Sequence, residues 1–209
     1  MRNAWKLFDF YGTPVYLKYW FLALILITTP VYLVSIFISI VVHELAHSFV
    51  AKKLGYKTDY IFIDIFHGGA LIDSSYTKNN KHAFKIAFAG PLSNFILAFI
   101  GFILAIVVGT MSKLILDFMV IFIVVNLLIG VFNLLPIYPL DGGRICKSIL
   151  GMLLKDNNKA RLINGIFSTV VSSILLLTSL YFGEYVLAIF SAIFVYTSYL
   201  EIYPDKTIN

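Results

Sequence analysis

Five consecutive residues, His43-Glu44-Leu45-Ala46-His47, combine two imidazoles and a carboxylate at a spacing that suits metal chemistry. On a helix, residues four apart lie on one face, with their β-carbons about 5–6 Å apart. Two histidines placed this way can take two corners of a zinc tetrahedron, and the glutamate between them points towards a water molecule on the metal. The pattern predicts a metal centre with His43 and His47 as ligands and Glu44 as general base.

A five-residue motif can also arise by chance, so the segment around it matters. The motif lies in a long apolar stretch, where an ionisable residue near the middle of a membrane span costs roughly 2.5–3.5 kcal/mol. Ser35, Ser39, His43 and His47 recur every four residues and form one polar stripe on this stretch. The stripe favours a functional interpretation over chance and indicates a helix face turned to the interior of a helix bundle.

A catalytic zinc ion keeps three protein ligands and one open position, so a third ligand is needed from elsewhere. Asp141 follows Pro136 and Pro139, which end a helix, and precedes Gly142-Gly143, which are expected to form a sharp turn that folds the carboxylate back into the bundle. It also follows a span that returns to the side of the membrane nearest the two histidines. Asp141 is therefore the predicted third ligand.

Three other residues were alternatives for the third ligand. Asp117 is expected at the opposite face of the membrane, and His82 lies in a basic stretch that predicts a solvated side chain. His67 lies on the correct side, before Gly68-Gly69, and remains an alternative ligand.

The elements that must hold these residues are membrane helices. Of the 209 residues, 60% are hydrophobic and 13% are charged, whereas soluble chains are about one quarter charged. A spanning helix needs about 20 mostly apolar residues. The sequence predicts an all-α polytopic membrane protein that forms a single domain over residues 1–209, with six spans at about 15–29, 30–54, 83–109, 114–135, 162–182 and 185–202.

A small β element is expected between the second and third spans. The stretch from Tyr60 to Ile72 is rich in β-branched and aromatic residues and is too short to span as a helix, so it predicts two short strands around a turn. The stretch from Trp5 to Tyr16 also has a strand-like pattern.

The distribution of basic residues predicts the orientation. With both termini in the cytoplasm and six alternating spans, 15 of the 16 Lys and Arg residues lie on the cytoplasmic side, and only Lys113 lies outside. This asymmetry accounts for the net charge of +5 without a nucleic-acid partner. The one cysteine, Cys146, excludes an internal disulfide.

These motifs, in this order, resemble those of the site-2 protease family of intramembrane zinc metalloproteases. His43-Glu44-x-x-His47 resembles its zinc motif, and Asn133-x-x-Pro136-x-x-x-x-Asp141-Gly142 resembles the signature that supplies its third ligand. The segment Gly90-Pro91-Leu92-Ser93-Asn94 is similar to a third family feature. The sequence shows no PDZ or CBS pattern, and by resemblance we expect a minimal member of the sporulation-type and archaeal kind.

The resemblance implies one Zn²⁺ per chain and an activity on peptide bonds within or beside the transmembrane segment of a membrane-protein substrate in the lipid bilayer. It also implies that Asn94 and Asn133 lie by the active site, where they would hold the substrate backbone or the oxyanion. Gly68 and Gly69 are further candidates for substrate binding. A transmembrane metal-ion transporter and an inactive scaffold for membrane helices are the alternative functions, and no oligomeric state is predicted.

A substrate helix offers no free amides, so it must unwind before it can be cut. The strand region from Ile61 to Leu71 is predicted to pair with the unwound segment by strand addition.

Overall fold

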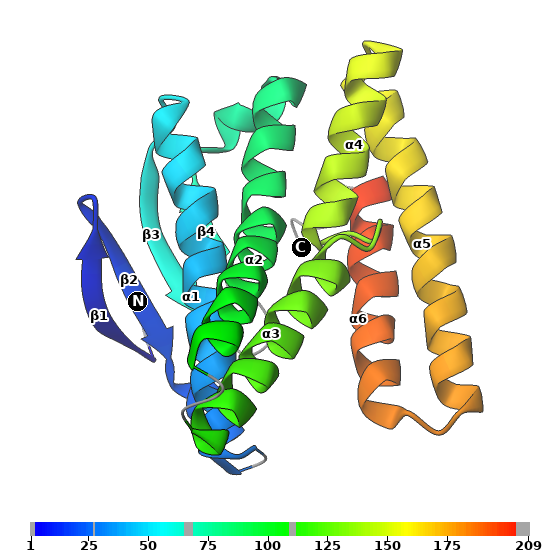
Figure 1. Cartoon of the computed structure of the whole chain (residues 1–209). Coiled ribbons are helices and arrows are strands. Elements are labelled where there is room, and N and C mark those ends of the chain that lie inside the picture. The colour runs from blue at the N-terminus through cyan, green and yellow to red at the C-terminus, as the bar shows by residue number, and fades with distance from the viewer. Residues whose placement is uncertain (1–2, 27, 65–68, 109–111, 204–209) are drawn as a thin grey trace. The chain divides into compact units, whose positions relative to one another are not determined.

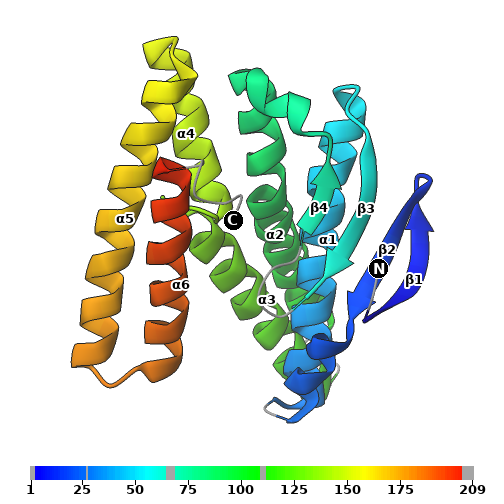
Figure 2. The same cartoon turned by 180° about the vertical axis from the view of Figure 1, so that it is seen from behind.

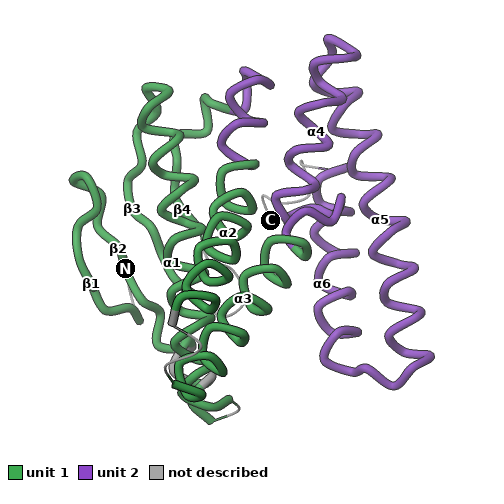
Figure 3. Tube along the Cα trace, in the orientation of Figure 1, with its two compact units in different colours: residues 1–76, 88–132 green, residues 77–87, 133–209 purple. Residues whose placement is uncertain are grey.

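The computed structural model of the chain describes residues 3–26, 28–64, 69–108 and 112–203 (Figure 1). The chain divides into two compact units, residues 1–76 with 88–132 and residues 77–87 with 133–209 (Figure 3), and each is described by itself. The single domain predicted for residues 1–209 stays a prediction. The helices are α1 (Pro30–Lys53), α2 (Asn80–Val108), α3 (Lys113–Asn133), α4 (Asp141–Leu154), α5 (Asn157–Tyr181) and α6 (Tyr185–Ile202).

Helices dominate the chain, and a small sheet accompanies them, as the sequence predicts. Within the described ranges, five helices are long and apolar enough to cross a membrane, namely α1, α2, α3, α5 and α6. Their large apolar side chains, such as Phe99 and Leu128, are exposed. An exposed apolar surface of this kind suits lipid rather than water as the surrounding solvent.

The first predicted span, residues 15–29, is wrong. Strand β2 (Thr13–Lys18) and a 3₁₀ helix, η1 (Tyr19–Leu26), occupy most of this segment, and α1 begins at Pro30. Proline suits the first position of a helix because its missing N–H would have no partner there. Val15 and Leu17 of β2 face a core inside the first unit, so the apolar character of this segment reflects burial against protein.

The sheet has four strands in the order β1-β2-β3-β4 (Figure 2). Strand β1 (Ala4–Phe10) pairs antiparallel with β2 around Tyr11-Gly12, where both residues have positive φ angles of 48° and 75°. Strand β2 pairs in parallel with β3 (Thr58–Ile63), and β3 pairs antiparallel with β4 (Gly69–Ile72). The two predicted strands are therefore β3 and β4, and the strand-like N-terminal segment extends the same sheet.

One face of this sheet packs on α1. The core consists of Val15 and Leu17 of β2, Phe21 of η1, Val41 of α1, and Ile61 and Ile63 of β3. Because side chains alternate across a strand, residues 15 and 17 and residues 61 and 63 lie on the same face. Beyond the sheet, Lys52 near the end of α1 donates a hydrogen bond to the carbonyl oxygen of Tyr11 (2.5 Å). The sheet thus supports α1 along the length that carries the histidines.

The second unit is a group of helices in which α5 packs closely against α6 and α4 against α5. Small polar residues line the packed faces: Ser168, Ser172 and Ser179 on α5 and Ser191 and Ser198 on α6 are buried. Most of these hydroxyls donate to a carbonyl one turn earlier on their own helix. Small residues let two apolar helices approach closely in a membrane.

Candidate metal centre

Helix α1 presents the two histidines on its buried face. His43, Glu44 and His47 are all buried, together with Ser35 and Ser39 of the predicted stripe. The two imidazole rings lie with their centroids 4.8 Å apart and their planes at 80° to each other. The polar stripe read from the sequence is therefore an interior stripe in the structure.

Gly90 of α2 lies directly against both imidazoles. A β-carbon built on Gly90 would lie 2.5 Å from Nε2 of His43 and still closer to Nε2 of His47. Any side chain at this position would fill the space in front of the two nitrogen atoms. A metal ion bound to both histidines needs that same space, so the absence of a side chain at residue 90 is part of the site. The sequence placed Gly90 in a motif and gave it no role.

Asn94, one turn further along α2, is fully buried and contacts the first histidine. Its Oδ1 lies 2.6 Å from Nδ1 of His43, and its Nδ2 donates to Oδ1 of Asn126 on α3 (3.0 Å). Asn126, also fully buried, was missed at the level of sequence. The available signal was a lone amide in an otherwise apolar span, which needs a hydrogen-bond partner inside the protein.

Asp141 is the first residue of α4 and is buried. A carboxylate at this position is favoured because the first N–H groups of a helix carry partial positive charge. Gly142 and Gly143 do not form the predicted turn, since they belong to the first turn of α4 and neither has a positive φ. Their role is close packing: a β-carbon on Gly142 would collide with the carbonyl oxygens of Leu134 and Leu135.

Hydroxyl groups of α5 and α6 anchor the loop that leads to Asp141. Ser168 Oγ accepts a hydrogen bond from the backbone N–H of Tyr138. Thr197 and Ser198 donate to the carbonyl oxygen of Tyr138, over 3.3 and 3.2 Å. The first turn of α4 packs on the same loop, because a β-carbon on Gly143 would lie 2.7 Å from Tyr138 N. Sequence reasoning missed these anchors, since serines and threonines are common in such helices.

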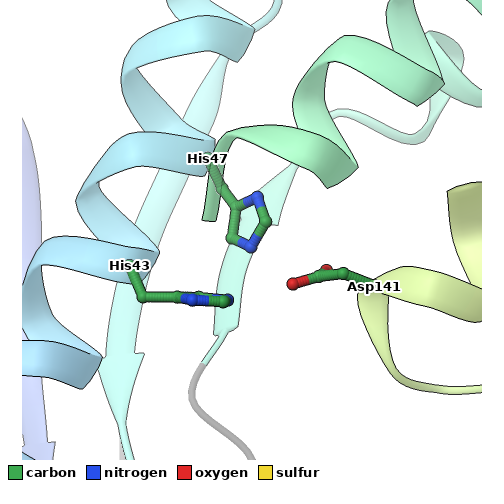
Figure 4. A group of neighbouring side chains, drawn as sticks. All are labelled: His43, His47 and Asp141. Carbon is green, nitrogen blue, oxygen red and sulfur yellow. The ribbon is translucent and has the colours of Figure 1, made fainter. Parts of the chain in front are cut away.

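His43, His47 and Asp141 each offer one ligand atom, and these atoms all lie within 4.8 Å of one another (Figure 4). The alternative Asp117 instead forms an exposed ion pair with Lys113 (2.7 Å). His67 lies outside the described residues. Two imidazoles and one carboxylate are a donor set that zinc prefers.

The remaining predicted site residues are Asn133, Gly68, Gly69 and Asn94. Asn133 is the last residue of α3 and is partly buried. Gly69 begins β4, and a β-carbon there would lie 2.8 Å from the Phe62 ring, so this glycine makes room for an aromatic side chain on β3. Gly68 lies outside the described residues. The predicted substrate-binding roles of all four stay predictions.

Comparison with known proteins identifies the family. The sequence model of peptidase family M50 matches residues 31–114 and 104–177. These ranges include both histidines, Gly90, Asn94 and Asp141. The chain belongs to peptidase family M50. The recognition of a site-2 protease pattern in the sequence is thereby confirmed.

This M50 chain is similar to individual proteins of an archaeon and a bacterium. It is 33% identical over 163 residues to a zinc metalloprotease of Methanocaldococcus jannaschii, covering 72% of this chain and 46% of the relative. It is 31% identical over 113 residues to stage IV sporulation protein FB of Bacillus subtilis, covering 54% of this chain and 38% of the relative. The chain thus spans less than half the length of these curated relatives.

A solved structure supports the fold of the M50 chain over nearly its whole length. The site-2 protease of Methanocaldococcus jannaschii superposes with a TM-score of 0.68 and 28% sequence identity, over 95% of each chain. With five apolar helices of sufficient length, the M50 chain is a multi-pass membrane protein. Zinc is the metal that the names of its relatives and its His, His and Asp donor set have in common.

Proposed function

We propose that this M50 chain is an intramembrane zinc endopeptidase that hydrolyses peptide bonds within or beside the transmembrane segment of membrane-protein substrates. The observation that carries the proposal is the buried group of His43, His47 and Asp141 beside a buried glutamate, Glu44. Four ionisable groups, two imidazoles and two carboxylates, are costly to bury in an apolar helix bundle unless they bind a metal or each other.

His43, His47 and Asp141 would hold the ion, and the donor set fits zinc in number and type. When bound, zinc would polarise the scissile carbonyl and lower the pKa of a coordinated water to about 7. Glu44 adjoins His43 on α1 and is buried with it. In this position its carboxylate takes a proton from the attacking water and later delivers it to the leaving amine.

The predicted pairing of the unwound substrate with the region from Ile61 to Leu71 must be assigned to a strand with an open edge. Strand β3 lies inside the sheet, between β2 and β4, so its edges are already paired. The edge strands in the described residues are β1 and β4, and β4 (Gly69–Ile72) follows the turn predicted to approach the substrate. We therefore place the pairing of the unwound substrate on β4, where main-chain groups give affinity with little sequence dependence.

Proline tests this assignment because it removes a backbone donor from an edge. Leu71→Pro in β4 is expected to impair cleavage while zinc binding stays unchanged. The matched control is Leu7→Pro in the other edge strand, at the register shift between Lys6 and Phe8. Equal cleavage by the two variants would rule out pairing on β4.

The principal experiment concerns Glu44. Purified Glu44→Gln protein is incubated with a single-span substrate and analysed for bound zinc. Cleavage is expected to fall by about 10²–10⁴-fold, the usual contribution of a general base, while one zinc per chain remains. Glu184→Gln, an exposed glutamate before α6, is the matched control and should change neither quantity. Unaltered cleavage by Glu44→Gln would refute the assignment, and zinc flux across vesicles would favour a transporter.

The cytoplasmic location of both termini was predicted from six alternating spans, whereas the described residues contain five helices of spanning length, an odd number that does not return the chain to the same side. The location of the C-terminus in the cytoplasm stays a prediction, and it places the turn between α4 and α5 in the cytoplasm and the turn between α5 and α6 outside. In a Cys146→Ser background, an impermeant thiol reagent applied outside intact cells should label Glu184→Cys and leave Asn158→Cys unlabelled. The reverse result would invert the topology.

A further inference from the structure

Asn126 is a fully buried amide in the middle of α3 that the proposed chemistry does not use. Its Nδ2 donates to the carbonyl oxygen of Phe122, one turn earlier on the same helix (2.9 Å). Its Oδ1 accepts from Nδ2 of Asn94 (3.0 Å). Both ends of the Asn126 amide are therefore occupied, and one of them leads to α2.

Asn94 continues this chain to the histidine. Its Nδ2 also faces the carbonyl oxygen of Ser39 on α1 (3.4 Å), and its Oδ1 faces Nδ1 of His43 (2.6 Å). The line of contacts therefore runs from the α3 backbone through Asn126 and Asn94 to the imidazole ring. All four residues in the line from Ser39 to Asn126 belong to the first unit.

Two backbone carbonyls fix the direction of every hydrogen bond in this line. A carbonyl oxygen only accepts, so the nitrogen of the Asn126 amide must face Phe122, and its oxygen must face Asn94. Asn94 must then present its nitrogen to Asn126 and to Ser39, which leaves its oxygen for His43. An amide oxygen only accepts, so Nδ1 of His43 must carry the proton.

The consequence falls on the other nitrogen of the ring. A neutral imidazole with a proton on Nδ1 has a free lone pair on Nε2. Nε2 is the atom of His43 that faces the space in front of Gly90. The alternative tautomer would place a hydrogen on Nε2 and could not bind a metal through that atom.

We infer that Asn126 is a positioning residue that acts through Asn94 to hold His43 in the tautomer and orientation required for zinc. The inference rests on the proposed function, because it takes His43 as a zinc ligand. Partners of this kind, which hold the second nitrogen of a ligating histidine, typically contribute 10–100-fold to metal affinity. Asn94 has the direct contact and Asn126 the indirect one, so Asn126 should have the smaller effect.

The test measures zinc affinity by competition with a chelator, on the purified full-length chain stripped of metal. Asn94→Leu is expected to weaken zinc binding by about 10–100-fold and Asn126→Leu by about 3–10-fold. The double variant should bind no more weakly than Asn94→Leu alone, because Asn126 acts only through Asn94. Independent, additive losses would overturn the inference and assign Asn126 a general packing role.

A matched control and a conservative variant separate positioning from stability. Asn164 of α5 is also buried, and its side-chain amide has no hydrogen-bond partner among the described residues. Asn164→Leu should leave zinc affinity unchanged. Asn126→Asp loses the donor towards the Phe122 carbonyl oxygen but keeps an acceptor oxygen towards Asn94, so its zinc affinity should stay above that of Asn126→Leu. If Asn126→Asp bound zinc as weakly as Asn126→Leu does, the inference would be contradicted.

A measurement on the wild-type chain does not depend on any variant folding. With ¹⁵N-labelled histidine, the metal-free protein should show the His43 proton on Nδ1, and a proton on Nε2 would overturn the inference. Failure of the proposed function has a different signature, namely a wild-type chain that binds no zinc. If the wild-type chain binds zinc and Asn126→Leu binds it equally tightly, the inference is rejected and the proposed function stands.

Discussion

The two histidines and the aspartate are held by opposite means. His43 and His47 lie one turn apart on α1, and their neighbours Gly90 and Asn94 lie one turn apart on α2. Asp141 instead follows a seven-residue loop, 134–140, whose backbone is tied to α5 and α6 by side-chain hydroxyls. Regular helix geometry positions the histidines, whereas the carboxylate depends on contacts that are far away in the sequence.

This difference predicts which kind of substitution should weaken each half of the site. On the histidine side the site is sensitive to added side-chain volume, because the backbone of α2 approaches the imidazoles where Gly90 has no side chain. On the aspartate side the site is sensitive to the loss of hydrogen bonds, because the N–H and the carbonyl of Tyr138 both bond to side-chain hydroxyls. Substitutions that probe one kind of support should leave the other intact.

The largest effect is expected from Gly90→Ala. The new β-carbon would occupy the space in front of both Nε2 atoms, so zinc affinity should fall by about 100-fold or more. Chelator competition measures this loss. Gly101→Ala on the same helix is the control, since the atoms nearest to its β-carbon would be side-chain atoms of Ile123 and Phe122, the first at 3.1 Å. Unchanged zinc affinity in Gly90→Ala would contradict the conclusion that the missing side chain of Gly90 leaves room for the metal.

An intermediate effect is expected from Ser168→Ala. It removes the hydroxyl acceptor of the partly buried Tyr138 N–H, and an unsatisfied buried donor costs up to about 1–3 kcal/mol. Thermal unfolding should show this loss, and zinc affinity should fall a few-fold as the loop before Asp141 loosens. Ser172→Ala is the control, because within the described residues that hydroxyl bonds to carbonyls of its own helix alone. The zinc effects of Ser168→Ala and Asn126→Leu should add, because the two residues share no contact. Strong coupling would show that the two supports are one network.

The smallest effect concerns Asp156, which caps α5 by accepting hydrogen bonds from the N–H groups of Asn158 and Lys159 (3.0 Å each). The Lys159 N–H bond, followed by that of Asn158, holds the pKa of the carboxyl below its usual 3.8. A lowered folded-state pKa means that the cap stabilises the fold above this pH and loses its contribution as the pH falls through the folded value. Asp156→Asn keeps a capping oxygen that does not titrate.

Thermal unfolding of the two proteins on either side of pH 3.8 tests this cap. The melting temperature of the wild type should fall relative to Asp156→Asn as the pH drops below that value. Zinc affinity at neutral pH should be the same in both, because the hydrogen bonds of Asp156 lie within the first turn of α5. A change in zinc affinity would mean that the start of α5 contributes to the site.

The comparison also explains which features were predictable from the sequence. His43, Glu44 and His47 were readable because their relation depends only on the 3.6-residue period of one helix. Asp141 was identified by its proline-rich approach and by family resemblance, but the reason given for Gly142 and Gly143 was wrong. Glycine has two uses, freedom of backbone angle and absence of a side chain, and a sequence does not say which one applies.

The first predicted span failed for a related reason. A short apolar run does not distinguish a strand from a helix when both of its faces are covered. The partner that decides the matter for Val15 and Leu17 is β3, whose Ile61 and Ile63 lie more than 40 positions later. Asn126 was missed in the same way, because its significance comes from Asn94 on another helix. Features that depend on one element were predictable, and features that depend on a distant partner were not.

The parallel pairing of β2 with β3 has a consequence for biosynthesis. Residues 19–57, including all of α1, are made between the two strands. The hairpin of β1 and β2 therefore leaves the ribosome with the edge of β2 still unpaired, and open edges invite pairing with other chains. That edge can be covered by β3 only after α1 has been made, so the N-terminal sheet cannot be completed before the helix that carries the histidines is present.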